Sequence, residues 1–447
     1  MEVLRHTNSL CPVCLKRITA VLEKDGEDVY LRKLCPDHGD FSCVLWRGKP
    51  DFEEWTSRRF PLSGPQDKPE NACPESCGLC GEHKQKSCTV ILEVTENCQL
   101  KCPVCFADAG SPREAGFDFL AGMLGDIRRK APEAILQISG GEPTLRDDIC
   151  DLVGLASELE YPGLQLNTNG LRLAEEPGFA SCLKKAGLGW VFLQFDGLRE
   201  STHIALRGRS LRSAKEQAIR ACEESGLGVV LVPTLVPGIN DDEMGDIIRF
   251  ALEKFPVVRG VHFQPISYFG RFPGPPADEN RITLPEVMNG LVEQTGGMMK
   301  LSHFHPSRCE HERCSFRGVY LVEKPERITP VGSGACCFGS STAEEGAKSA
   351  IESIRRRWGA DVASVYPAKY STNSAESEIE DAFERFIRIY ERGSFSISAM
   401  AFQDAENLDL ERLRFCCVHV ASHDGRLVPF CAWNLTGRDG RTLHRCR

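Results

Sequence analysis

The fold class of this chain is decided by one stretch, Thr95-Glu96-Asn97-Cys98-Gln99-Leu100-Lys101-Cys102-Pro103-Val104-Cys105, which directly follows an apolar run. Its cysteines have the spacing C-x3-C-x2-C. On a single loop, this spacing lets three thiolates bind three irons of a cubane and leaves the fourth iron without a protein ligand. An open iron can bind a reactant, so the loop predicts a catalytic 4Fe-4S cluster held by Cys98, Cys102 and Cys105. A zinc knuckle or an electron-transfer cluster is the alternative that the spacing alone leaves open.

The surrounding sequence alternates short apolar runs with amphipathic segments, a pattern typical of βα units and a parallel sheet. Strands are expected at 89–94, 135–138, 164–166, 191–195, 228–235 and 261–265. Helices are expected at 117–130, 147–159, 179–186, 213–225 and 241–255, the last beginning at the acidic Asp241 and Asp242. Six such units predict an α/β fold, a partial (β/α)6 TIM-like barrel. Its chemistry is expected in the loops at the carboxyl ends of the strands.

Polar motifs follow three of these strands. Ser139-Gly140-Gly141-Glu142-Pro143 ends the second strand, and its small residues let the backbone approach a ligand closely. Asn167-Thr168-Asn169-Gly170 and Gln194-Phe195-Asp196-Gly197 end the third and fourth strands, where short polar side chains can bind a cofactor or cap the next helix. Gln264, on the sixth strand, is a candidate for a substrate or cofactor contact. His262 is better explained as a core residue.

The cysteine loop and the Gly-Gly-Glu-Pro motif together resemble the radical S-adenosylmethionine (SAM) superfamily. In that superfamily, SAM chelates the open iron through its amino and carboxylate groups, and an electron from the reduced cluster breaks its sulfonium carbon-sulfur bond. The resemblance implies that Gly140, Gly141 and Glu142 lie at the SAM amino group. By the same resemblance, the carboxylate and ribose of SAM are contacted by Thr168, Asn169 and Asp196.

The chain has 447 residues, 22 cysteines and a formal net charge of -9. The charge offers no broad basic field for nucleic acid. Residues 1–19 lack the continuous apolar segment of a secretory signal, so a cytoplasmic, reducing location is expected, in which thiols bind metal rather than form disulfides. No apolar run is long enough to span a bilayer, which makes the protein peripheral to a membrane at most.

The first cysteine cluster predicts a mononuclear site before the barrel. Cys11-Pro12-Val13-Cys14 and Cys35-Pro36-Asp37-His38 have the spacing of the two knuckles of a metal ribbon. Iron and zinc both accept tetrahedral thiolate ligation, so the sequence does not choose between them. The fourth ligand is His38 or, less favoured, Cys43.

Two auxiliary iron-sulfur clusters are expected beside the catalytic one. Cys73, Cys77 and Cys80 repeat the C-x3-C-x2-C spacing and are expected to be completed by Cys88. A further cluster is expected among carboxyl-terminal cysteines that include the doublets 336–337 and 416–417. The candidate ligands there are Cys309, Cys314, Cys336, Cys417 and Cys431.

These observations divide the chain into three expected regions. Residues 1–87 show little periodicity and form a metal-dependent region, 88–300 form the barrel, and 301–447, in which regularity decays, form a second metal region.

Four segments carry a closer resemblance, to the tetraether lipid synthase family of radical SAM proteins. They are 102–107 (Cys-Pro-Val-Cys-Phe-Ala), 77–80 (Cys-Gly-Leu-Cys), 232–241 and 428–434. The resemblance implies three 4Fe-4S clusters and one rubredoxin-like iron. It also implies a lipid substrate, with coupling of the terminal carbons of isoprenoid chains after hydrogen is removed from a methyl carbon. An electron donor such as a ferredoxin or flavodoxin is the expected partner.

Two other functions remain open. One is a radical SAM methyltransferase acting on a pterin or another small heterocycle, which needs a methyl or methylene donor. The other is an iron-sulfur electron carrier, which has no use for Gly140, Gly141 and Glu142.

Overall fold

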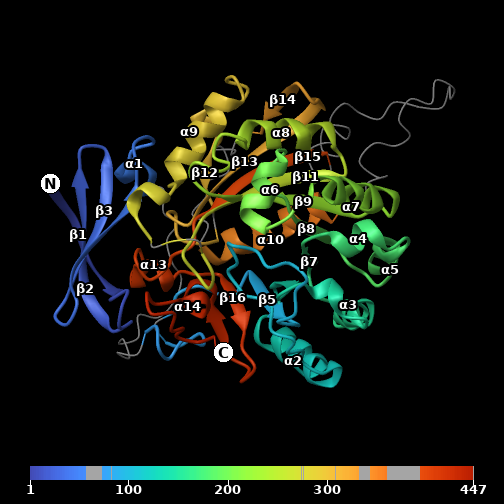
Figure 1. Cartoon of the computed structure of the whole chain (residues 1–447), viewed down its shortest axis with the longest axis horizontal. Coiled ribbons are helices and arrows are strands. Elements are labelled where there is room, and N and C mark those ends of the chain that lie inside the picture. The colour runs from blue at the N-terminus through green and yellow to red at the C-terminus, as the bar shows by residue number, and fades with distance from the viewer. Residues whose placement is uncertain are drawn as a thin grey trace.

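The structure is a computed structural model that describes residues 1–56, 73–81, 83–272, 274, 276–307, 309–331, 343–359 and 393–445. Its strands form two sheets, a four-stranded antiparallel sheet at the amino terminus and a large mixed sheet that forms the barrel. Figure 1 shows the small sheet at one end of the molecule, beside the carboxyl-terminal segments that cover the mixed sheet.

The small sheet has the order β1 (Glu2–Leu10), β2 (Arg17–Asp25), β3 (Asp28–Cys35) and β4 (Gly39–Trp46). The sequence showed little periodicity in this region, yet it forms four regular strands. Inward positions of β3 alternate with exposed ones, but they include Lys33 and Cys35 as well as Val29 and Leu31. Because a buried lysine interrupts the apolar pattern, the period of two is hidden in the sequence.

The predicted barrel is confirmed. Its parallel strands, hydrogen-bonded in chain order, are β5 (Thr89–Glu93), β6 (Ile135–Ser139), β7 (Leu164–Thr168), β8 (Trp190–Gln194), β9 (Gly228–Val232) and β11 (Val258–Pro265). A two-residue strand, β10 (Thr234–Leu235), also pairs with β11. The connecting helices are α2 (Phe117–Lys130), α3 (Ile149–Glu158), α4 (Leu171–Glu175), α5 (Phe179–Lys185), α6 (Glu200–Arg207), α7 (Arg212–Glu224) and α8 (Met244–Glu253).

Each barrel strand has one apolar face and one partly polar face. Leu136, Ile138 and Leu166 are fully buried and belong to the main hydrophobic core, which includes residues of the surrounding helices. The alternate residues, such as Gln137 and Gln165, line the interior of the barrel. This alternation follows from the period of two of a strand. The polar interior indicates a binding cavity rather than a packed core.

Helix α8 begins at Met244, not at Asp241 as predicted. The two aspartates serve the preceding turn, where Asp241 accepts from the Gly238 backbone N–H at 2.7 Å and Asp242 pairs with Arg199. The residue preceding the helix is Glu243.

The carboxyl-terminal part of the chain extends both edges of the barrel sheet. On one side, β15 (Ser394–Met400) runs parallel to β11 and is followed by β13 (Ser315–Lys324), which pairs with β12 (His305–Pro306) and β14 (Arg327–Pro330). On the other side, β16 (Val418–Ala421) runs parallel to β5 and pairs with β17 (Leu427–Pro429). The expected boundary near residue 300 therefore does not separate two sheets.

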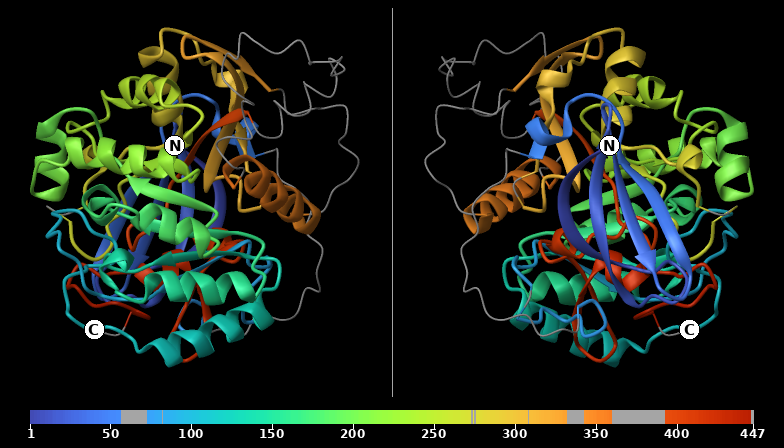
Figure 2. Two further views of the ribbon diagram at one scale, coloured as in Figure 1. Left: turned by 90° about the vertical axis from the view of Figure 1, so that its right-hand side faces the viewer. Right: turned by 90° about the vertical axis from the view of Figure 1, so that its left-hand side faces the viewer.

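The remaining α-helices of the described structure are α1 (Phe52–Thr56), α9 (Leu284–Gln294), α10 (Ala343–Trp358), α13 (Leu410–Leu413) and α14 (Phe430–Asn434). Figure 2 shows α10, in orange, on the side of the molecule away from the green helices α6 and α7. The Trp358 indole N–H donates to Ser396 of β15 at 2.9 Å, which fixes the end of α10 to the barrel. None of the described helices combines the length and apolar character needed to cross a bilayer.

Candidate active site

A cavity of about 420 Å³ occupies the interior of the barrel. Its walls are the inward-facing residues of the parallel strands, together with β15, α10 and the loop of Cys98, Cys102 and Cys105. Cys88 and Cys309 line the same cavity. Two sets of cysteines therefore face one space inside the barrel.

The loop after β5 presents its thiols to backbone donors. The Leu100 N–H donates to the Cys98 sulfur at 3.4 Å, and the Ala109 N–H donates to the Cys105 sulfur at 3.5 Å. Burial raises the pKa of Cys98 to about 12 and also raises the pKa of Cys102. Thiolates at these positions therefore depend on a bound metal, while the N–H donors suit cluster sulfur ligands. The three side chains fit an iron-sulfur cluster.

Glycine is required at positions 140 and 141 because the backbone there lies very close to the cysteine loop. A Cβ atom on Gly140, whose φ is +132°, would lie 2.3 Å from the Thr95 carbonyl oxygen, and one on Gly141 would lie 2.2 Å from that of Asn97. The Gly141 N–H donates to Thr95 O at 2.7 Å. The glycines therefore hold the end of β6 against the cysteine loop.

Glu142 is buried, and its carboxylate accepts four hydrogen bonds. The donors are the Thr144 N–H and hydroxyl, the Thr168 hydroxyl at 2.7 Å and the Asn169 N–H at 2.7 Å. These bonds tie the end of β6 to the end of β7. Glu142 was predicted to lie at the SAM amino group. Its carboxylate is already engaged by these four hydrogen bonds, so we interpret Glu142 as a residue that positions the ends of the two strands.

Thr168 and Asn169 line the cavity, as Gly140, Gly141 and Glu142 do. The Asn169 amide donates to Gln99 at 3.3 Å, and its oxygen accepts from the Leu171 N–H at the start of α4. Asn169 is therefore both a cavity residue and a helix cap.

Asp196 was predicted to contact the cofactor, but its environment is that of a buried ion pair. It is fully buried, is absent from the cavity lining and forms a bidentate ion pair with Arg207 at 2.6 and 2.7 Å. Arg207 lines the cavity and donates to the Val104 carbonyl at 3.0 Å, next to the cluster loop. Burial alone would raise the pKa of Asp196, but Arg207 holds it below its usual range.

Arg207 and Lys215 are site residues that the sequence reasoning missed. Lys215 is buried, and its ammonium donates to the Asn169 carbonyl and to Gln194. Burial lowers its pKa to about 7. Each is a single charged residue on an amphipathic helix, so no local signal distinguishes it from a solvent-facing one.

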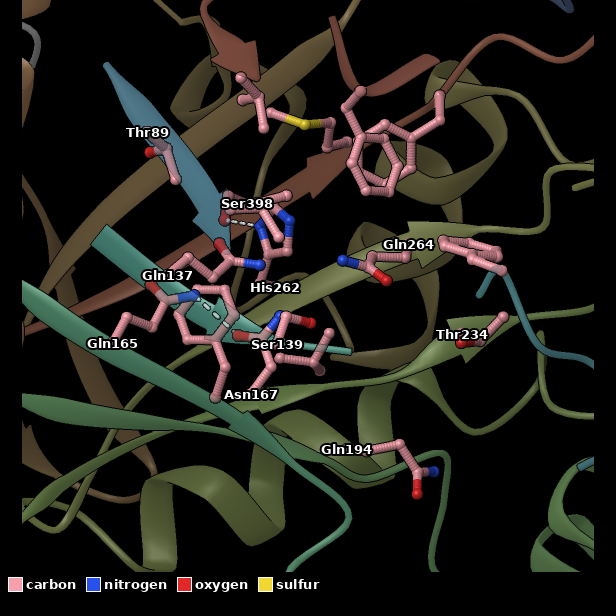
Figure 3. A pocket seen from close by; sticks show the side chains of 18 of the residues that line it. Thr89, Gln137, Ser139, Gln165, Asn167, Gln194, Thr234, His262, Gln264 and Ser398 are labelled. Atoms are coloured by element: carbon pink, nitrogen blue, oxygen red, sulfur yellow. Dashed lines mark hydrogen bonds between the residues drawn. The ribbon is translucent and has the colours of Figure 1, made fainter. Parts of the chain in front are cut away.

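Neutral polar side chains from successive strands surround the middle of the cavity (Figure 3). His262 and Ser398 form a hydrogen bond of 2.8 Å, and the amides of Gln165 and Asn167 form one of 3.0 Å. In contrast, Gln137 and Gln264 direct their amides into the cavity without a hydrogen bond to any described residue. The labelled residues are Thr89, Gln137, Ser139, Gln165, Asn167, Gln194, Thr234, His262, Gln264 and Ser398.

The amino-terminal sheet brings the predicted mononuclear ligands together. The ligand atoms of Cys11, Cys14, Cys35 and His38 all lie within 4.8 Å of one another, and Cys43 is outside this group. Burial alone would raise the pKa of Cys35, but several hydrogen bonds, the strongest of them with His38, lower it to about 7. Three sulfurs and one imidazole nitrogen match a tetrahedral zinc or iron site.

The comparisons with known proteins agree with these sites. A model of the radical SAM superfamily matches residues 92–251, and a model described as HMPTM N-terminal zinc ribbon domain matches residues 3–47. The 7,8-dihydro-6-hydroxymethylpterin dimethyltransferase of Methanocaldococcus jannaschii is 33% identical over 99% of this chain and 94% of its own length. The chain belongs to the same radical SAM family as this dimethyltransferase.

Other matches cover a smaller part of the chain. A GTP 3',8-cyclase of Listeria monocytogenes is 33% identical over 40% of this chain and 55% of the cyclase. Among solved structures, Streptococcus suis SuiB bound to S-adenosylmethionine is 16% identical, with a TM-score of 0.35 over 41% of each chain.

A second group of thiols in this radical SAM protein joins three distant segments. The Cys88 and Cys417 sulfurs are 2.8 Å apart, and hydrogen bonds with Cys417 and Cys88 lower the pKa of the Cys309 thiol. Cys88 was expected to complete the group of Cys73, Cys77 and Cys80. It lies with Cys417 instead, because its backbone N–H donates to the Cys417 carbonyl at 2.8 Å as β5 and β16 come together.

The adjacent Cys416 belongs to a different group. Burial raises its pKa, as do the nearby thiols of Cys431 and Cys314. The Arg412 guanidinium donates to the Cys314 sulfur at 3.0 Å, and the Gln403 N–H donates to the Cys431 sulfur at 3.2 Å. The sequence reasoning left Cys416 out, because nothing in a doublet tells which member is the ligand.

Two remaining predictions concern the other carboxyl-terminal and amino-terminal cysteines. Cys336, a predicted ligand, lies outside the described residues. Cys73, Cys77 and Cys80 surround a small void together with His83 and Leu413, as expected of a separate metal site. The Cys77 pKa is raised, mainly by its hydrogen bond with Cys73 and by burial.

Proposed function

We propose that this radical SAM enzyme methylates a pterin or a similar small heterocycle bound in the barrel cavity. The support is the dimethyltransferase relative, which matches over nearly the whole chain, together with the free amides of Gln137 and Gln264. An amide offers one acceptor and two donor hydrogens, which is the complement of the alternating donors and acceptors on a pterin edge.

With SAM bound at the Cys98, Cys102 and Cys105 cluster, the cofactors supply a deoxyadenosyl radical for hydrogen abstraction. The protein positions the reactants. Gly140 and Gly141 allow β6 to approach the cluster loop, and Glu142 locks the ends of β6 and β7 together. Enclosure by the barrel and by α10 excludes water and keeps the reacting atoms close.

Coupling of isoprenoid lipid chains is the second candidate, favoured by a different part of the cavity. The walls near α10 include an apolar group, Phe192, Ile354 and Trp358, beside the polar Ser353 and Arg357. Such an apolar group suits a hydrocarbon chain better than a heterocycle. The family resemblance of the four sequence segments also supports this reaction.

One experiment separates these functions. The reconstituted, reduced enzyme would be incubated with SAM and with either dihydrohydroxymethylpterin plus a methyl or methylene donor, or archaeal diether lipid in detergent. We expect substrate-dependent deoxyadenosine and a methylated pterin by mass spectrometry. A doubled lipid chain would replace the first proposal by the second. Absence of SAM cleavage would leave only the electron carrier.

Variants of the two free amides sharpen the test. Gln137→Leu and Gln264→Leu keep the approximate side-chain volume but remove the hydrogen bonds, so each should raise the KM for a heterocycle about tenfold or more. SAM cleavage without substrate should be unchanged. Unaltered KM values in both variants would contradict recognition of the pterin by these amides.

For the remaining sites, we propose a mononuclear zinc or iron at Cys11, Cys14, Cys35 and His38, and auxiliary iron-sulfur clusters at the other cysteine groups. The thiol groups fit such clusters because their sulfurs accept hydrogen bonds from N–H donors, as at Cys314 and Cys431. A ferredoxin or flavodoxin is the proposed electron donor.

A further inference from the structure

Glu310 is the carboxylate that faces the cavity beside the thiols of Cys88, Cys309 and Cys417. It follows Cys309 directly in the chain and lines the cavity. The Cys417 thiol donates to a Glu310 carboxylate oxygen 3.8 Å away. The carboxylate therefore lies on the cavity side of this group, within reach of the same metal.

The contacts of Glu310 hold it in place but do not neutralise it. The Ser307 hydroxyl donates to one carboxylate oxygen at 2.8 Å, and the Ser315 hydroxyl donates to the other. No lysine or arginine within the described ranges forms an ion pair with it. Elsewhere around the barrel, the buried Asp196 and Asp404 each pair with an arginine. A desolvated carboxylate without a cation is costly, and a bound metal ion would remove that cost.

Glu310 lines the cavity together with Cys88 and Cys309, and two serine hydroxyls hold its two carboxylate oxygens. The arrangement is typical of a ligating carboxylate, whose outer hydrogen bonds orient it toward its metal.

We propose that Glu310 is the exchangeable fourth ligand of the auxiliary iron-sulfur cluster at Cys88, Cys309 and Cys417. This inference rests on the auxiliary cluster that is part of the proposed function. Three thiolates leave one iron of a cubane open, and a carboxylate oxygen binds that iron less tightly than a thiolate does. When Glu310 leaves, the iron facing the cavity can bind an oxygen or nitrogen donor of the substrate, or a small anion such as cyanide.

The test isolates the auxiliary clusters from the catalytic one. The full-length chain carrying Cys98→Ala, Cys102→Ala and Cys105→Ala would be reconstituted with the Mössbauer-active iron isotope. We expect one iron with the spectrum of an oxygen-ligated site. Glu310→Cys should convert that iron to the all-thiolate type, and Glu310→Gln should change its parameters. Glu312→Gln, a buried carboxylate two residues further along that contacts His311, is the matched control and should leave the spectrum unchanged.

A second measurement tests directly whether the ligand exchanges. Cyanide added to the reduced chain should shift the EPR signal of one auxiliary cluster, and Glu310→Cys should abolish this response. Identical Mössbauer spectra for Glu310→Gln and its parent, or a cyanide response that survives Glu310→Cys, would overturn the ligand assignment. Absence of any iron-sulfur spectrum from the triple variant would overturn the auxiliary clusters themselves, which is a different failure.

Discussion

At the scale of single residues, the glycines of the β6 loop show why the motif cannot vary. Gly141→Ala would place a methyl group against the Asn97 carbonyl, where backbone rather than a flexible side chain must move. We expect the cluster loop to shift and SAM cleavage to fall at least a hundredfold, because such chemistry tolerates little displacement. Gly125→Ala in α2, where nothing lies within 4 Å of the new methyl group, is the control and should keep full activity. Deoxyadenosine formation measures both variants, and equal rates would contradict the steric argument.

The ion pair of Asp196 and Arg207 is buried next to the cluster loop. Asp196→Asn would leave the Arg207 guanidinium buried without its counter-charge, so we expect the free energy of unfolding to fall by about 3 to 5 kcal/mol. Asp242→Asn removes one of the two carboxylate partners of Arg199, in an exposed pair, and should cost less than about 1 kcal/mol. Urea unfolding of the two variants checks this difference. Equal costs would mean that burial of the pair is unimportant.

At the scale of elements, one aspartate joins the amino-terminal sheet to the carboxyl-terminal segments. Asp409, at the start of α13, binds Arg5 of β1 at 2.7 Å, Thr7 of β1 at 2.7 Å and Arg313 at 2.6 Å. Burial alone would raise the pKa of Asp409, but the two arginines lower it to about 2. Because the folded pKa lies below the unfolded value of 3.8, the stabilisation is complete above about pH 4 and is lost as the pH falls through about 2.

Asp409→Asn should therefore lower the free energy of unfolding at neutral pH by about 3 kcal/mol. The difference from the wild type should shrink by about 2 kcal/mol as the pH falls from about 4 to 2, since each pKa unit is worth about 1.4 kcal/mol. Glu411→Gln, which removes the more exposed second partner of Arg5, should cost less than about 1 kcal/mol and is the control. Denaturant titrations across this pH range measure the effect. A difference independent of pH would contradict an ionised Asp409.

The same scale shows what the sequence could predict. The barrel strands were predictable because apolar runs alternate with helical periods, and β6 to β8 fall within a few residues of the expected ranges. Strand β15 was not predicted, although its serines alternate with the buried Phe395, Ile397 and Ala399 in the period of two that is typical of a strand. Local spacing located the mononuclear group and the catalytic loop. It could not group Cys88 with Cys417, which are 329 positions apart and meet only when the sheet forms.

At the scale of the whole molecule, the extended edges of the sheet place a second group of cysteines at the cavity that the cluster loop also lines. Strand β16 brings Cys417 beside Cys88 at the start of β5, and the segment before β13 brings Cys309 and Glu310 to the same place. The catalytic loop follows the opposite end of β5. A substrate held among the barrel amides therefore lies between a cluster that binds SAM and a second group of thiols.

This arrangement predicts that Cys416 and Cys417, which are adjacent and lie just before β16, have separable functions. Cys417→Ala should remove the auxiliary cluster facing the cavity, and Cys416→Ala should remove the cluster with Cys314 and Cys431. Each variant should lose a different EPR signal and about one cluster's content of iron and sulfide. Product formation should be lost in Cys417→Ala even though SAM is still cleaved, since Cys88 and Cys309, which are grouped with Cys417, line the cavity, whereas Cys314, Cys416 and Cys431 are not among the described residues that line it.

The control for this comparison is Cys222→Ala, a buried thiol of α7 whose pKa is raised by burial alone. It should keep every metal signal. If Cys416→Ala and Cys417→Ala instead lost the same EPR signal, both cysteines would belong to a single cluster. That cluster would then face the cavity on one side only. Both cysteines lie just before β16, and it is the Cys417 sulfur that contacts Cys88, so the two adjacent side chains can serve separate sites.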